Sequence, residues 1–272
     1  MTILVIGDLH LGKDGQRLKI PSEWSAYDAV FLVGDVVDAD NRIPSLPDAV
    51  YSELATLGSP VVSIPGNHDF RAHASHVAGY EEITSIHTQR VAMVGHVIGG
   101  LGSTRFDEGP EVRGSPLQEM SSKKLLDAIE NWEEPPESDR KSSIANSITE
   151  QEYQWYQERL GSLQDLGLRS SDSPRILITH IPPFGSPGAY LESHPRGTGA
   201  VSWGSLAVRQ YLEEMDIALH LCGHIHEQSG ADIIADTVSL NAGYRNAFEI
   251  NLPVQNVADV SAVELEWVPH SA

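Results

Sequence analysis

Several clusters of acidic, amide and imidazole side chains stand directly after apolar runs that are typical of buried strands. Side chains at the ends of neighbouring strands can converge on one point, so these clusters predict a common site. Oxygen ligands mixed with imidazole nitrogens suit Mn, Fe, Zn, Ni or Co better than Ca or Mg alone. The predicted ligands of a centre with two metal ions are Asp8, His10, Asp35, Asn67, His180, His224 and His226.

The spacing within the clusters supports this interpretation. Asp8 and His10 are separated by one residue, and on an extended segment such residues point the same way. Gly34 allows the backbone to turn sharply before Asp35, whose carboxylate has two oxygens and can bridge two cations.

Two metal ions about 3.5–4 Å apart hold a phosphate oxygen, lower the pKa of a bridging water and stabilise the charge of an in-line displacement. The expected nucleophile is therefore a bridging hydroxide. His68 is the best candidate for a general acid or for a group that stabilises the developing charge. Asp38 or Asp69 could orient His68 through its other ring nitrogen.

The elements that must position these residues alternate in type. A strand, a helix and a strand with short turns begin the chain, which favours a sheet with parallel strands. We predict a layered α/β sandwich with a mixed sheet. Helices are expected at residues 48–57, 123–132, 150–160 and 205–214, and strands at 2–6, 29–33, 60–64, 91–98, 175–179, 217–221, 232–235, 237–241, 247–251 and 262–267.

The length of 272 residues suits one α/β domain spanning residues 1–272, with an insertion at about residues 107–147. That insertion is too short and polar to hold its own core. Residues 182–204 are rich in Gly and Pro and are interpreted as a long functional loop. Substrate specificity would lie in these two segments.

The bulk composition limits the location and the partners. There is no stretch of about 18 apolar residues and no basic leader with a cleavage site, so we expect a cytoplasmic protein without a membrane span. The net charge of −20 repels phosphate backbones and disfavours nucleic acid as a partner. This acidity fits either adaptation to high salt or an ordinary acidic protein. Cys222 is the only cysteine, so no intramolecular disulfide can form.

The ordered clusters resemble the calcineurin-like metallophosphoesterase superfamily over about residues 3–245, and the segment after His180 is similar to its small, mostly prokaryotic phosphoesterases. The resemblance implies an αββα sandwich of two mixed β-sheets flanked by helices, with a dimetal centre at the strand ends. Ala39 and Asp69 replace the Arg and Glu of the protein-phosphatase branch, which argues against phosphoprotein phosphatase activity. By resemblance, one metal would be held by Asp8, His10, Asp35 and His226, the other by Asp35, Asn67, His180 and His224, with His68 catalytic and Asp38 near it.

The expected function is therefore hydrolysis of a small phosphodiester or phosphomonoester with two divalent metal ions, of which Mn is favoured. The alternatives are a Mn-dependent nuclease and a non-enzymatic metal-binding scaffold. Other side chains have a functional and a structural interpretation. His73 and His76 could face the pocket, His194 could contact the substrate, and Arg196 and Arg245 could bind phosphate. Three aromatic residues are instead expected to pack against the domain, namely Tyr153, Trp155 and Tyr156.

Overall fold

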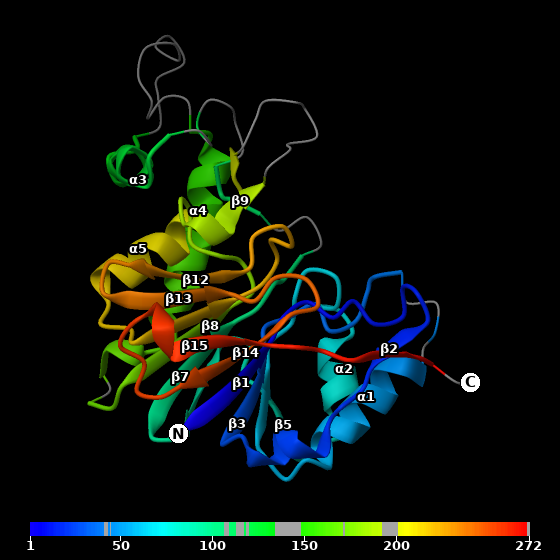
Figure 1. Cartoon of the computed structure of the whole chain (residues 1–272). Helices are drawn as coiled ribbons and strands as arrows, with labels where there is room; N and C mark the ends of the chain where they lie inside the picture. Colours follow the sequence, from blue (N-terminus) through cyan, green and yellow to red (C-terminus); the bar gives the residue numbers. More distant parts are fainter. Residues whose placement is uncertain are drawn as a thin grey trace.

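The computed structural model describes residues 1–40, 43, 45–105, 109–112, 117, 120–133, 148–170, 172–191 and 201–270. Its first six-stranded sheet has the order β15-β14-β1-β3-β4-β5 (Figure 1). Strands β1, β3, β4 and β5 are parallel, so their carboxyl ends meet at one edge. The bounds are Thr2–Ile6 for β1, Ala29–Leu32 for β3, Val61–Ser63 for β4, Ile83–Ser85 for β5, Ala247–Asn251 for β14 and Val260–Val263 for β15.

The second six-stranded sheet has the order β12-β13-β11-β8-β7-β6. Its four central strands are parallel, and β12 and β6 run antiparallel at the two edges. This sheet therefore also gathers carboxyl ends at one edge. The bounds are Gln89–Met93 for β6, His96–Leu101 for β7, Arg175–Thr179 for β8, Leu219–Cys222 for β11, Gly230–Ile234 for β12 and Thr237–Asn241 for β13.

The two sheets pack face to face through a shared apolar core. Val5 and Phe31 of the first sheet lie in one buried cluster with Leu221 of the second. Successive residues of a strand point to opposite faces, so Leu4 and Leu32 belong to a different cluster on the outer face of the first sheet. Strands buried on both faces read as continuous apolar runs, which explains their composition.

Helices cover both outer faces of the paired sheets (Figure 1). Helices α1 (Ser45–Ala55) and α2 (His73–Val77) lie on the first sheet, and α3 (Ser122–Glu130), α4 (Glu150–Asp165) and α5 (Leu206–Glu214) lie on the second. The start of α4 is fixed by a capping box between Thr149 and Glu152. The layered αββα architecture with two mixed sheets is confirmed.

Short elements complete the fold. Two small antiparallel sheets pair β2 with β16 and β9 with β10. Their bounds and those of the 3-10 turns are β2 Gln16–Leu18, β9 Tyr190–Leu191, β10 Val201–Ser202, β16 Trp267–Pro269, η1 Ser22–Ala26, η4 Leu168–Ser170, η5 Pro187–Ala189 and η6 Val257–Asp259.

The apolar run at residues 91–98 was predicted as one strand, and this was wrong. It is split between β6 and β7, which form an antiparallel hairpin. Val94 has a φ of 47° and Gly95 a φ of 72°, and a two-residue turn with both φ values positive matches the twist of a hairpin. Gly95 is the turn signal in this run, but Val94 before it is β-branched and gives no indication of a left-handed φ. The run predicted at 262–267 is likewise divided between β15 and β16.

Much of the predicted insertion, namely residues 106–108, 113–116, 118–119 and 134–147, lies outside the described residues. Its helix α3 buries Leu125 and Ile129 in the same cluster as Leu177 of β8. A single domain with an insertion stays a prediction. Within the described ranges, no helix is both long enough and apolar enough to cross a membrane.

Candidate metal centre

The predicted ligands gather where the carboxyl ends of the two sheets meet. Asp8 follows β1, Asp35 follows β3 and Asn67 follows β4 in the first sheet. His180 follows β8 directly, and His224 comes shortly after β11 in the second sheet. The structure brings all seven predicted ligands together: Asp8, His10, Asp35, Asn67, His180, His224 and His226.

Three of these residues have a left-handed backbone. The φ values are 46° at His10, 48° at Asp35 and 70° at His224. Residues with side chains adopt this region rarely, and such strain collects at functional sites. The extended segment predicted at Asp8 and His10 is therefore not found. The turn at His10, rather than alternation along a strand, brings its ring beside Asp8.

Two glycines of the clusters are required by close packing. A Cβ on Gly66 would overlap the carboxylate of Asp35, and a Cβ on Gly223 would overlap the carboxylate of Asp8. The backbones that carry Asn67 and His224 can therefore approach the two carboxylates only if these positions lack a side chain.

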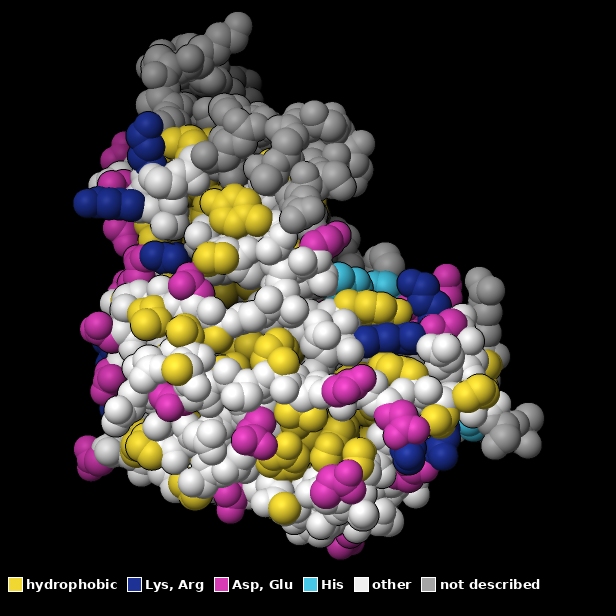
Figure 2. Space-filling view, viewed as in Figure 1, with side chains coloured by type: hydrophobic (Ala, Val, Ile, Leu, Met, Phe, Trp, Pro, Cys, Tyr) yellow, Lys and Arg dark blue, Asp and Glu magenta, His cyan; other side chains and the backbone are white. Residues whose placement is uncertain are grey.

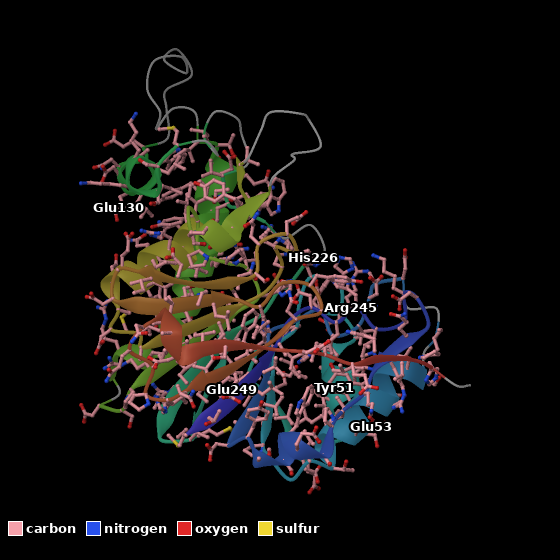
Figure 3. All side chains as sticks on the ribbon, in the orientation of Figure 1. Tyr51, Glu53, Glu130, His226, Arg245 and Glu249 are labelled. Carbon is pink, nitrogen blue, oxygen red and sulfur yellow. The ribbon has the colours of Figure 1, made fainter. Side chains whose placement is uncertain are left out.

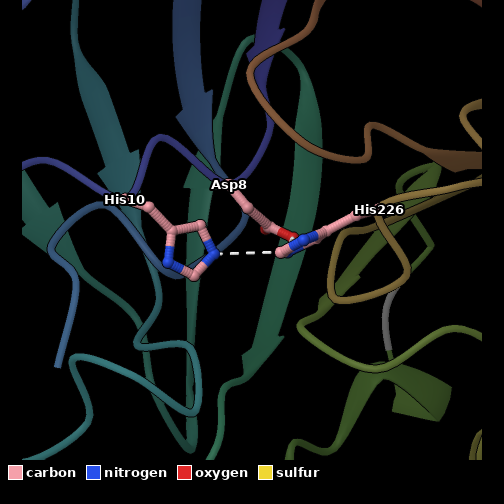
Figure 4. A group of neighbouring side chains, drawn as sticks. All are labelled: Asp8, His10 and His226. Atoms are coloured by element: carbon pink, nitrogen blue, oxygen red, sulfur yellow. Dashed lines mark hydrogen bonds and ion pairs between the residues drawn. The ribbon is translucent and has the colours of Figure 1, made fainter. Parts of the chain in front are cut away.

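Asp8, His10 and His226 form a first group of potential ligands (Figure 4). Nε2 of His10 lies 3.2 Å from Nε2 of His226, which lies 3.4 Å from Oδ2 of Asp8. Nδ1 of His10 lies 2.9 Å from Oδ2 of Asp38. An ionised carboxylate can only accept, so Nδ1 donates and the lone pair of His10 stays on Nε2, facing the group.

Asn67, His180 and His224 form a second group. Oδ1 of Asn67 lies 2.9 Å from Nδ1 of His224 and 3.0 Å from Nε2 of His180. Nδ1 of His180 donates to the carbonyl oxygen of Val33 at 2.9 Å, which leaves Nε2 to face Asn67. Oδ2 of Asp35 lies 3.3 Å from Nε2 of His180 and 3.7 Å from Nε2 of His10, so it stands between the two groups.

These distances fit divalent metal ions. Two donor atoms bound at about 2.1 Å to one ion lie roughly 3.0–3.4 Å apart. The contacts within the groups, from 2.9 to 3.4 Å, have this spacing. Among the described residues, Oδ1 of Asp8 is buried without a hydrogen-bond partner. Nε2 of His180 faces the oxygen atoms of Asn67 and Asp35, an arrangement that a cation between them would stabilise.

The electrostatics of the centre also favour added positive charge. Burial by itself lowers the pKa of His180, but the carboxylate of Asp35 outweighs it and raises the pKa to about 10. Burial opposes ionisation of Asp35, yet His180 holds the pKa of Asp35 below its usual range. Burial and then the charge of Asp35 raise the pKa of Asp69 to about 7. Carboxylates crowded in this way are stabilised by a proton or by a metal ion.

His68 lies at the rim of the centre. Its backbone N–H donates to Oδ1 of Asp35 at 2.7 Å, and its side chain is 27% exposed. The ring stands edge-on to His10, with 4.6 Å between the ring centroids. Nδ1 of His68 lies 3.8 Å from Asp38, whose closer partner is His10. Asp69 instead accepts from backbone N–H groups of the two neighbouring turns, so it ties those turns together.

Tyr244 and Arg245 lie beside the first group. The sequence singled out Arg245 but not Tyr244. The ring of Tyr244 lies 5.0 Å from that of His226 and 5.6 Å from that of His10. Arg245 lies near His226 in Figure 3. It donates to Asp14 and lies over the ring of Trp267. Histidine side chains reach the surface beside Lys or Arg side chains in Figure 2. The side chain of His226 is 39% exposed, so the centre is open to solvent.

The other residues that the sequence suggested for the site lie in different places. His73 is buried in α2 and lies 3.2 Å from the hydroxyl of Ser85, and His76 pairs with Asp48, so neither belongs to the two groups. His194 and Arg196 lie outside the described residues. Tyr156 is buried as expected.

The sequence matches the profile of the family described as calcineurin-like phosphoesterase over residues 1–228, and the chain belongs to this family. A solved structure superposes with a TM-score of 0.57 over 99% of both chains at 15% identity. TT1561 of Thermus thermophilus superposes with a TM-score of 0.51 over 99% of both chains at 14% identity. These likenesses show the fold.

A curated relative is the UPF0046 protein K07C11.7 of Caenorhabditis elegans, which is 30% identical over 94 residues. The match covers 35% of this chain and 30% of that relative, so the chain spans less than a third of its length. Membership of this family supports the assignment of the chain as a metal-dependent phosphoesterase.

Proposed function

We propose that this protein hydrolyses a small phosphodiester or phosphomonoester with two divalent metal ions, Mn being favoured. The observation that carries the proposal is the position of Asp35, since one of its oxygens faces His10 in the first group and His180 in the second. A carboxylate shared in this way can bind two neighbouring ions. The proposed ligands are Asp8, His10, Asp35 and His226 for one ion, and Asp35, Asn67, His180 and His224 for the other.

The residues around the ligands would prepare them for metal binding. Asp38 keeps the proton of His10 on Nδ1, and the carbonyl of Val33 does the same for His180. Burial holds the pKa of His224 well below its ordinary value, so its imidazole stays neutral. Neutral imidazole is the form that binds a metal.

Two bound ions would supply a hydroxide nucleophile at neutral pH and neutralise the charge of the phosphate. His68 is placed to assist: the bond from its N–H to Asp35 fixes its backbone, and its ring is partly exposed beside His10. A protonated His68 would donate to the leaving oxygen or stabilise the developing negative charge. Asp38 would support this role, since it lies near the rings of both His10 and His68.

The test measures metal content and hydrolysis together. Purified protein loaded with Mn should hold two ions and cleave p-nitrophenyl phosphate or bis(p-nitrophenyl) phosphate. Because general acid–base groups contribute about 10²–10⁴-fold, His68→Ala should reduce kcat by that factor while both ions are retained. His76→Ala, on α2 beside Asp48, is the matched control and should keep full activity. Metal-loaded protein that cleaves no phosphate ester would refute the proposal.

The nuclease and scaffold alternatives are tested in the same preparation. Cleavage of single- or double-stranded DNA with Mn would favour a nuclease, which the net charge of −20 disfavours. Two bound ions without turnover of any ester would favour the scaffold.

A further inference from the structure

A hollow of about 260 Å³ lies beside α4 and has no role in the centre described above. Leu101 and Gly102 at the end of β7 form one side of it, and α4 forms the other. Arg105 follows the end of β7 and also lines the hollow. Its position next to the centre and the chemistry of its walls indicate what it could bind.

The α4 residues that line the hollow belong to one face of the helix. Residues at i, i+3, i+4 and i+7 share a face of an α-helix. A separate stripe of α4, with Tyr156, Leu160 and Leu163, is buried in the core. The face that lines the hollow consists of Trp155, Glu158, Arg159 and Ser162.

The hollow lies near the second group of potential ligands. A narrow cleft lined by His180 shares Leu101, Gly102 and Arg159 with it. The backbone N–H of Ser103 donates to the carbonyl of Pro65 at 2.9 Å, which holds the end of β7 against the turn that leads to Asn67. A molecule with its phosphate at the centre could therefore extend into the hollow.

The guanidinium of Arg159 is held in place by a buried carboxylate. Its Nη1 donates to Oε1 of Glu111 at 2.7 Å, and Glu111 is fully buried. Glu111 also accepts from the hydroxyl of Ser205 and from the backbone N–H of Leu206, which begins α5.

A planar cation lies over a planar aromatic ring in the hollow. Cζ of Arg105 lies 4.1 Å from the centroid of the Trp155 ring. Trp155 is half-buried, so the prediction that it packs against the domain describes only part of its surroundings. Aromatic rings and arginine planes are both surfaces on which bases stack. Glu158 adds a hydrogen-bond acceptor for an amino group.

We infer that the hollow binds the planar, nitrogen-containing aromatic group of a phosphate ester, a nucleobase in chemical class, while the phosphate lies at the metal centre. This inference rests on the proposed function. Trp155 and Arg105 supply stacking surfaces and Glu158 an acceptor. Arg105 and Arg159 place two cations in the hollow, in a chain whose net charge is −20.

The test compares adenosine 5′-phosphate with ribose 5-phosphate, and their methyl esters for diester hydrolysis. Each pair breaks the same bond and differs only in the base. Stacking on an aromatic residue contributes about 1–3 kcal/mol per base, so kcat/KM should be about 5- to 150-fold higher for the nucleotide. Trp155→Leu should bring the ratio close to one, and Trp155→Phe should keep part of it. Trp132→Leu is the control, because Trp132 stacks on Tyr153 outside the hollow, and it should keep the full ratio.

A second measurement separates this inference from the proposed function. Adenosine, which has no phosphate, should quench tryptophan fluorescence of the metal-free protein, and Trp155→Leu should abolish this response. Adenosine binding without hydrolysis of any ester would overturn the proposed function and support a base-binding role of the hollow. Ester hydrolysis with equal kcat/KM for nucleotide and sugar phosphate would overturn only the inference that the hollow binds a nucleobase. A ratio that survives Trp155→Leu would overturn it as well.

Discussion

Asp38→Asn should weaken one metal site and leave the other intact. Oδ2 of Asp38 lies 2.9 Å from Nδ1 of His10, and Asp38 is 6% exposed, so water cannot readily replace it. An amide keeps the size of the carboxylate but removes its charge. When its NH₂ faces His10, the proton moves to Nε2 and blocks the lone pair that would bind metal.

The magnitude follows from the way in which Asp38 orients His10. Partners that orient a ligating histidine contribute about 10–100-fold in metal affinity, which corresponds to roughly 1.4–2.8 kcal/mol. The second site should keep its affinity, because the orientation of His180 is set by the backbone carbonyl of Val33. Titration calorimetry of Mn into the metal-free protein should therefore show one weakened site and one unchanged site.

Asp28→Asn is the matched control for this experiment. Asp28 also accepts a hydrogen bond, from the backbone N–H of Thr2 at 2.7 Å, but it lies at the opposite ends of β1 and β3. Both sites should keep their affinity in this variant. Equal weakening of the two sites by Asp38→Asn, or no weakening with an unchanged melting temperature, would show that the assignment of Asp38 to His10 is wrong.

Three further predictions concern stability and packing. Gly223→Ala should abolish metal binding by the first group in the calorimetric titration, because its Cβ would displace the carboxylate of Asp8; wild-type affinity at that site would contradict this. Removal of metal with EDTA should lower the free energy of unfolding by about 2.7 kcal/mol per site relative to metal at 100 times its Kd, as measured by urea titration. Burial lowers the pKa of His73 from 6.5 to about 4, so the folded protein binds fewer protons than the unfolded chain in this window and loses stability as pH falls through it. Between pH 7 and pH 4, wild type should lose about 3 kcal/mol more than His73→Gln in urea titrations, and equal losses would contradict the buried neutral state.

Much of the fold could be predicted because its signals are local. Buried parallel strands need continuous apolar runs, and β8 begins and ends where the sequence predicted. The hairpin of β6 and β7 was missed because Gly95 is a single turn signal and the β-branched Val94 before it does not favour a left-handed φ. Only pairing with neighbouring strands favours that conformation over a continuous strand.

The gathering of the ligands could be predicted as well, because parallel strands place their carboxyl ends together. The backbone geometry could not. Positive φ values at His10, Asp35 and His224 raise the local energy, and contacts with distant segments must compensate for it. Gly66 and Gly223 are visible in the sequence, but the carboxylates that require them come from other strands.

The sequence by itself therefore determined which side chains are present, their order, and the layered fold that brings strand ends together. These depend on residue type and on spacing along the chain. Only the tertiary structure decided that Asp35 stands between two groups of ligands and that Trp155 and Arg105 share a hollow beside them. Such contacts join residues far apart in the chain, so they depend on how the two sheets and α4 pack against each other.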